Sequence, residues 1–95
     1  MVKINGILYE LSEKKDKKLK AYVNSSWIHF GQKGYDHYKD ATSLLPKSQN
    51  HLDEKRRELY LKRASKITDK EGNLTKDDKT SSNFHALRIL WNYNK

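Results

Sequence analysis

Alternating apolar and polar positions mark the start of the chain as a series of short β-strands. Val2-Lys3-Ile4 leads into Asn5-Gly6, and residues 7–11 then alternate as a half-buried strand does. Asn-Gly favours a two-residue hairpin turn, because both residues tolerate a positive φ. The pattern therefore predicts either a hairpin at Asn5-Gly6 or a bulge at that point in one longer strand.

The same alternation predicts two further strands. Residues 12–18 form a charged turn, and residues 19–23 then place Leu, Ala and Val at every second position. Residues 24–26 turn the chain again, and residues 27–30 (Trp-Ile-His-Phe) have the composition of a strand. We expect the glycines in residues 31–34 to end the sheet. The result is an antiparallel meander of three strands, or four with the first arm.

A helix is the clearest element of the second half. It follows residues 35–50, which lack a period and which we interpret as an ordered loop held by its aromatic residues. Asn50 is a suitable N-cap, and the apolar spacing predicts a helix from Leu52 to Ile67. At about 100° per residue, its buried face is expected to hold Leu52, Leu59, Tyr60, Ala64 and Ile67.

A second helix is predicted at the end of the chain. Residues 68–80 are polar and are expected to form a loop, after which Ser81 or Ser82 can cap the helix. Its buried stripe is expected to consist of Phe84, Leu87, Leu90 and Trp91. We therefore predict an α+β fold in one domain, residues 1–95. A small antiparallel sheet is followed by a long loop and two helices packed on one face.

The composition limits the class of protein and the cellular location that we expect for this domain. Apolar residues make up 35% of the chain and charged residues 34%, which indicates a small core under a charged surface. There is no cysteine, so disulfides and thiolate metal sites are excluded. Neither a signal-peptide core nor an apolar run of about 18 residues is present. We expect a protein that is neither secreted nor membrane-bound.

The charge balance points to an acidic partner. The formal net charge is +8, from 20 Lys and Arg against 12 Asp and Glu. Such an excess attracts polyanions, of which nucleic acid is the commonest. The alternative is that the lysines only keep a small protein in solution. The candidate contact residues are Lys55, Lys62, Lys66, Arg57 and Lys33.

A second group of polar residues is expected among the apolar positions of the first helix. Asp53, Arg56, Tyr60 and Arg63 are spaced 3, 4 and 3 apart, so they share one side of a helix. Buried arginines need acceptors, and Asp53, with Asp36 or Asp40 from the loop, can supply them. The pattern predicts a salt-bridged brace between loop and helix. The alternative is a site in which the guanidinium groups bind phosphate or a carboxylate.

No catalytic motif is present. The four histidines are not paired at metal-ligand spacing, and there is neither a phosphate-binding glycine loop nor a nucleophile elbow. His29 is expected to be a hydrogen-bonded packing residue. Only His51 and Asp53 leave open a metal site of the nuclease kind. We expect no enzymatic activity, no cofactor and no resident metal.

An ordered string of residues resembles a known family. It consists of His29-Phe30-Gly31-x-Lys33-Gly34-Tyr35, Asp40, His51-x-Asp53-x-x-Arg56-x-x-x-Tyr60-x-x-Arg63 and Leu90-Trp91-Asn92. These residues are similar to a family of small basic proteins, without an assigned activity, that giant (nucleocytoplasmic large) DNA viruses and tailed bacteriophages encode. Residues 42–50 look like an insertion relative to that family, and Phe84 stands where a Trp is usual. The resemblance implies a viral origin and a fold unit, but no reaction.

Together these observations lead to one expected function and two alternatives. The expected function is that of a viral or phage accessory protein which binds an acidic partner without catalysis. That partner is nucleic-acid phosphate or an acidic viral or host protein. The alternatives are a virion structural protein, either capsid-associated or a cement protein, and a metal-dependent nuclease. The expected location is the host cytoplasm or the virion.

Overall fold

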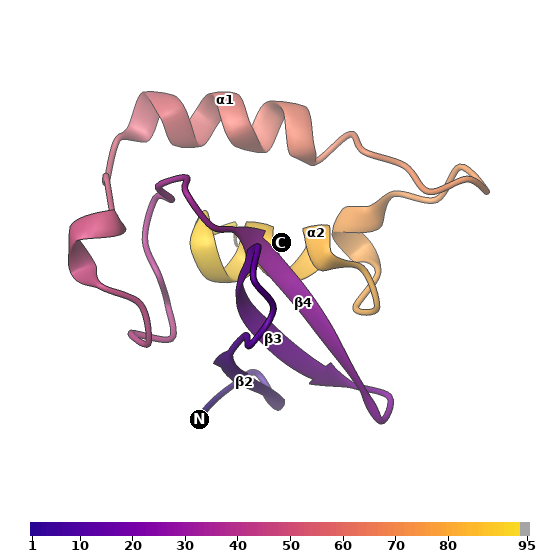
Figure 1. The fold of residues 1–95 in the computed structure, drawn as a ribbon. Coiled ribbons are helices and arrows are strands. Elements are labelled where there is room, and N and C mark those ends of the chain that lie inside the picture. Colours follow the sequence, from indigo (N-terminus) through magenta and orange to yellow (C-terminus); the bar gives the residue numbers. More distant parts are fainter. Residues whose placement is uncertain (94–95) are drawn as a thin grey trace.

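The computed structural model describes residues 1–93 and has four strands followed by helices (Figure 1). The strands are β1 (Val2–Ile4), β2 (Ile7–Leu11), β3 (Lys17–Val23) and β4 (Ser26–Gln32). The helices are α1 (Glu54–Ala64) and α2 (Ser82–His85), and α2 continues into the π-helical segment η3 (Ala86–Leu90). Short 3₁₀ turns lie at Lys47–Gln49 and Thr75–Asp77. This is the predicted α+β fold, and none of the helices in the described residues is long and apolar enough to span a bilayer.

The sheet is an antiparallel meander in the order β1-β2-β3-β4. Ile4 pairs with Ile7 across the first turn, where Asn5 has φ 51° and Gly6 has φ 80°. The hairpin interpretation of Asn5-Gly6 is therefore confirmed, and the bulge is not needed. Asn24 and Ser25 make the third turn with φ values of 50° and 64°. Positive φ at both central residues is the geometry that matches the twist of paired strands.

The sheet ends within residues 31–34, as predicted, but Gly31 still belongs to the last strand. β4 runs through Gly31 to Gln32, and Gln32 pairs with Lys17. Gly31 has φ 76°, and a Cβ there would lie only 2.9 Å from Leu90 Cδ1. Gly31 thus allows the last helix to pack closely on β4. This contact joins distant segments, so it could not be predicted from the residues around Gly31.

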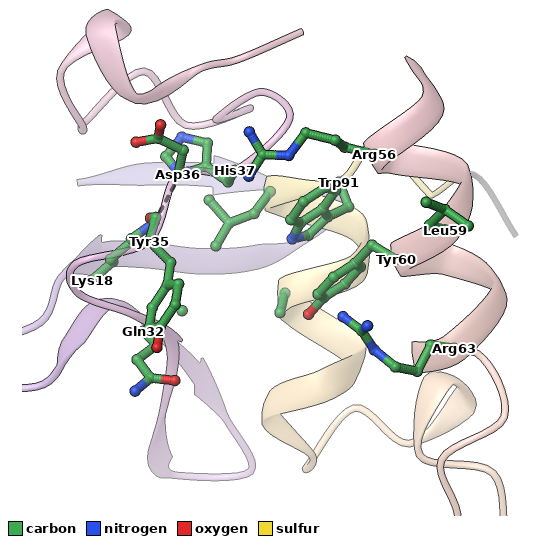
Figure 2. Close-up of a pocket in the computed structure, with 13 residues that line it drawn as sticks. Lys18, Gln32, Tyr35, Asp36, His37, Arg56, Leu59, Tyr60, Arg63 and Trp91 are labelled. Atoms are coloured by element: carbon green, nitrogen blue, oxygen red, sulfur yellow. Dashed lines mark hydrogen bonds between the residues drawn. The ribbon is translucent and has the colours of Figure 1, made fainter. Parts of the chain in front are cut away.

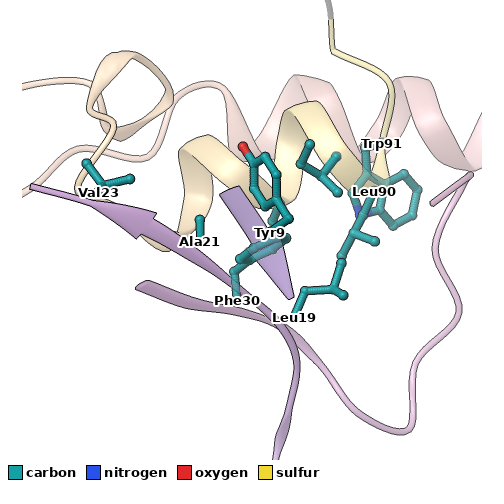
Figure 3. Packing of buried hydrophobic residues seen from close by; sticks show 9 residues of the cluster. Tyr9, Leu19, Ala21, Val23, Phe30, Leu90 and Trp91 are labelled. Atoms are coloured by element: carbon teal, nitrogen blue, oxygen red, sulfur yellow. The ribbon is translucent and has the colours of Figure 1, made fainter. Parts of the chain in front are cut away.

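The core lies between the sheet and the C-terminal helix (Figure 3). Its largest buried side chains from the sheet are Tyr9, Leu19 and Phe30, and Leu90 and Trp91 cover them from the helical side. Tyr9 and Phe30 meet edge to face with ring centroids 5.9 Å apart. The alternation of residues 19–23 is confirmed, because Leu19, Ala21 and Val23 are all buried.

The last helix begins where the sequence places it. The hydroxyl of Ser81 accepts a hydrogen bond from the Phe84 amide at 3.1 Å, so Ser81 is the N-cap. The predicted stripe of Phe84, Leu87, Leu90 and Trp91 is buried throughout. His85, not part of that prediction, is also buried, and its Nδ1 accepts a hydrogen bond from the Tyr9 hydroxyl at 2.9 Å.

The first helix is shorter than predicted and turned about its axis. It begins at Glu54, with Asp53 as N-cap accepting from the amides of Lys55 and Arg56. Leu52 cannot belong to it, because its φ is 55°. Leu52 and Leu59 are 58% and 59% exposed, and Ile67 is exposed as well. The inward side instead carries Arg57, Tyr60, Leu61 and Ala64.

Buried polar groups and one aromatic residue, Tyr38, hold the long loop before α1 in place. Tyr35 is 66% exposed, whereas His37 and Asp40 are buried. The Asp40 carboxylate accepts from the Thr42 amide, the Thr42 hydroxyl and the Leu45 amide at 2.6–2.9 Å. Asn50, expected to cap the helix, accepts from His37 and from the Asp40 amide through its side-chain oxygen. The loop is ordered, as predicted, and of its aromatic residues Tyr38 packs against the core whereas Tyr35 does not.

Candidate functional site

A pocket of about 460 Å³ opens between α1 and the loop that follows β4 (Figure 2). Gln32 and Tyr35 lie on its sheet side, and Tyr60 and Arg63 face them from α1. The remaining lining residues are Lys18, Gly31, Asp36, His37, Arg56, Leu59, Ala86, Leu90 and Trp91. Charged groups from three distant segments of the chain therefore converge on one hollow.

The back of the pocket is aromatic. The rings of Tyr60 and Trp91 are stacked with centroids 4.0 Å apart, and the centroid of the His51 ring lies 5.2 Å from that of the Trp91 ring. His51 Nδ1 accepts from the Asp53 amide at 2.9 Å, so its proton is on Nε2, which is buried without a partner among residues 1–93. Burial also raises the pKa of Tyr60, which keeps this wall neutral.

Lys18 is the least expected member of the lining. Only 5% of the residue is exposed. Its ammonium donates to the Tyr35 carbonyl and, at 3.1 Å, to His37 Nδ1. His37 must then carry its proton on Nε2, which donates to Asn50 Oδ1 at 2.7 Å. Burial lowers the pKa of Lys18, while Asp36 and Asp40 act to raise it.

The expected salt-bridged brace is not present in the described residues. Arg56 and Arg63 are exposed, and neither forms a salt bridge with Asp36, Asp40 or Asp53. Asp40 is saturated by its own loop, and Asp53 caps α1. The helix starts two residues later than expected and is turned so that both guanidinium groups reach the pocket rim rather than the core (Figure 2).

Arg57, rather than Arg56 or Arg63, is the arginine that bonds α1 to another segment of the described residues. Its Nε donates to the Trp91 carbonyl at 3.0 Å and its Nη2 to the Asn92 carbonyl at 2.8 Å. It also lies 3.5 Å from the Glu54 carboxylate and over the ring of Tyr38. Arg57 was expected to contact a partner, but here it joins α1 to the end of the last helix.

The other predicted contact residues are exposed. Together with the two pocket arginines they form what we call the basic face: Lys55, Arg56, Lys62, Arg63 and Lys66. At about 100° per residue these residues occupy one arc of α1 and its continuation, on which Leu59 is the only apolar residue. Glu54 and Glu58 lie together outside that arc. Lys33 is exposed in the loop after β4 and does not line the pocket.

The histidines and acidic residues serve local structure. His29 Nδ1 lies 2.7 Å from the Ser12 hydroxyl, which matches its expected role as a hydrogen-bonded residue. His51 and Asp53 bond to backbone amides of their own segment and do not converge on a common point. Within residues 1–93 no three His, Cys, Asp or Glu side chains are grouped as metal ligands.

Sequence reasoning missed Lys18, Gln32, Tyr35 and Trp91 as site residues. Lys18 lies in β3, whereas the sequence pattern placed it in the charged turn of residues 12–18. Strand alternation tells which face a residue occupies, but not that the loop after β4 covers it. The signal available was the pair of glycines flanking Gln32 and Lys33, which allows the loop to fold back.

Comparison with known proteins adds no identification, since no protein-family model, curated protein or solved structure matches this chain.

Proposed function

We propose that this protein binds the phosphate backbone of nucleic acid without catalysis, as a small accessory protein of a virus or phage. One observation carries the proposal, namely the basic face of α1. Five exposed cations occupy one arc, and both acidic residues of the helix lie outside it. Phosphate contacts made by such residues give affinity without reading sequence.

The +8 net charge and the resemblance to viral and phage proteins support the same interpretation. The basic face also suits a backbone better than a base edge. Three of its five members are lysines, whose ammonium groups act as mobile point charges rather than as planar forks. The predicted alternatives, a virion structural protein and a metal-dependent nuclease, have no specific observation in their favour.

The test is a salt titration of binding to unrelated duplex and single-stranded oligonucleotides, followed by fluorescence anisotropy. The variant carries Lys55→Gln, Lys62→Gln and Lys66→Gln. Each lysine that contacts a phosphate should contribute about 1 to the slope of log K against log salt. We expect weaker binding and a slope shallower by about 2–3, with little change in melting temperature because all three are exposed.

A matched control separates the basic face from net charge. Lys3→Gln, Lys14→Gln and Lys15→Gln remove the same charge from exposed positions in β1 and the turn after β2. The control triple should keep most of the parent's affinity. Equal losses in the two triples would overturn the assignment to α1, and absence of binding at low salt would overturn the proposed function.

A further inference from the structure

The pocket contains a buried ammonium, that of Lys18, which has no ion-pair partner within residues 1–93, although Asp36 and Asp40 act on it from a greater distance. Lys18 is 5% exposed, yet it forms no salt bridge with any carboxylate of residues 1–93. An ammonium has three N–H donors, and two of them point to the Tyr35 carbonyl and to His37 Nδ1. The third has no acceptor among residues 1–93 and belongs to a side chain that lines the pocket. Burying a charge without a counter-ion is costly, so such a group marks an anion site.

The surroundings hold this ammonium in a fixed position. His37 accepts from Lys18 on one side of its ring and donates to Asn50 on the other. Asn50 Oδ1 also accepts from the Asp40 amide at 3.0 Å, which fixes the orientation of its amide. A chain of buried and part-buried hydrogen bonds thus orients Lys18, as a preorganised site requires.

The charge at the pocket matches a phosphate monoester better than a diester. Lys18, Arg56 and Arg63 line it with three positive charges, and Asp36 contributes one negative charge, which leaves +2. A phosphate monoester carries about −1.5 to −2 at pH 7, whereas each backbone diester carries a single negative charge. Arg56 and Arg63 make no salt bridge within the described residues, so both guanidinium groups are available.

The size and walls of the pocket fit one nucleotide. Its volume of about 460 Å³ lies within the range of about 300–1,000 Å³ typical of small-ligand sites, and it cannot admit a duplex. The exposed ring of Tyr35 stands across the hollow from Tyr60 (Figure 2). A base stacked on an aromatic side chain gains affinity whatever its sequence.

We infer that this pocket binds the terminal phosphate monoester of a nucleotide, either free or at the end of a nucleic-acid strand. The phosphate lies against Lys18, Arg56 and Arg63, and the base packs against the exposed ring of Tyr35. The inference rests on the proposed function only where the nucleotide is the end of a nucleic-acid strand. Binding of a free nucleotide does not depend on that function.

The test compares short single-stranded oligonucleotides of one sequence that bear a 5′-phosphate, a 3′-phosphate or neither. Adenosine monophosphate, adenosine and inorganic phosphate serve as small probes in calorimetric titrations. We expect a terminal phosphate at one end to increase affinity at least about tenfold, as charge-assisted hydrogen bonds do. The monophosphate should bind more tightly than either adenosine or inorganic phosphate.

Three variants locate the effect. Lys18→Met removes the buried charge while keeping an apolar stem, and Arg63→Gln removes a rim cation from an exposed position that folding does not need. Both should abolish or strongly reduce the preference for the phosphorylated end. Lys62→Gln removes the same charge from α1 outside the pocket and should preserve the preference.

The outcomes separate this inference from the proposed function. Equal affinity for phosphorylated and unphosphorylated oligonucleotides in the parent protein would overturn the inference while leaving backbone binding by α1 intact. Inorganic phosphate binding as tightly as the monophosphate would overturn the role of the aromatic walls. Monophosphate binding that is lost in Lys18→Met, without any oligonucleotide binding, would support the pocket and overturn the proposed function.

Discussion

The indole of Trp91 stacks on the phenol ring of Tyr60, with the two planes 6° apart. Trp91 follows directly on η3 and Tyr60 lies in the middle of α1, so this pair joins two helices that are separated by a long polar loop. The same pair forms the back of the candidate pocket. A contact that holds the fold together thus also shapes the site.

Truncating Trp91 should therefore have a large effect on stability. We expect Trp91→Ala to lower the free energy of unfolding by about 3–5 kcal/mol, as large aromatic truncations in cores do. In a domain of this size that corresponds to a fall in melting temperature of well over 10 °C. Leu59→Ala is a matched control on an exposed position of α1, and it should change the free energy by no more than about 0.5 kcal/mol. Similar melting temperatures for the two variants would show that α1 and η3 are not held by this stack.

The strands were predictable from sequence because their signals are local. Asn5-Gly6 selects its turn through two residues that accept positive φ, and the alternation of residues 19–23 fixes which side chains face the core. Ser81 caps the last helix by the same kind of local bond. None of these features depends on what lies elsewhere in the chain.

The candidate site was not predictable to the same extent, because distant segments create it. The stack of Tyr60 on Trp91 sets which side of α1 faces the core. The predicted buried face was wrong because it included Leu59 and Ile67, which are exposed. Lys18 is buried by a loop that comes nearly twenty residues later. Sequence pattern did bring Arg56, Tyr60 and Arg63 together correctly, but not their surroundings.

Arg57, rather than Arg63, should be the arginine on which stability depends. Arg57 donates to the carbonyls of Trp91 and Asn92, which directly follow the last helix. We expect Arg57→Met to destabilise by about 1.5–3 kcal/mol, the range for hydrogen bonds to charged groups. Arg57→Lys should recover only part of that loss, since an ammonium cannot reproduce the planar fork.

Arg63→Met is the control for this prediction. Its guanidinium has no hydrogen-bonded partner in the described part of the chain, and only the Tyr60 ring lies near it. Urea unfolding should therefore show a change within about 0.5 kcal/mol. A larger loss in Arg63→Met than in Arg57→Met would restore the brace that the sequence predicts.

Buried histidines should make the fold sensitive to mild acid. His85 is fully buried and neutral, since Nδ1 accepts from Tyr9 and Nε2 donates to the Lys79 carbonyl at 2.7 Å. Burial is the main cause of its lowered pKa, and Arg88 lowers the pKa further, while the bond to Lys79 acts to raise it. Burial and the charge of Lys18 likewise lower the pKa of His37. Both rings resist protonation in the folded state.

The sign of the effect follows from which state takes up protons first. In the unfolded chain histidine titrates near pH 6.5, so below that value the unfolded state binds more protons than the folded state. Stability should then fall as pH decreases from about 7 to 5, by at most about 1.4 kcal/mol per pH unit for each histidine, and level off below the folded pKa. Urea unfolding across this range measures the slope. His85→Gln removes one titrating group and should make the slope shallower, whatever its effect on stability at pH 7.5. A free energy of unfolding that stays constant or rises toward pH 5 would show that these rings are not buried in neutral form.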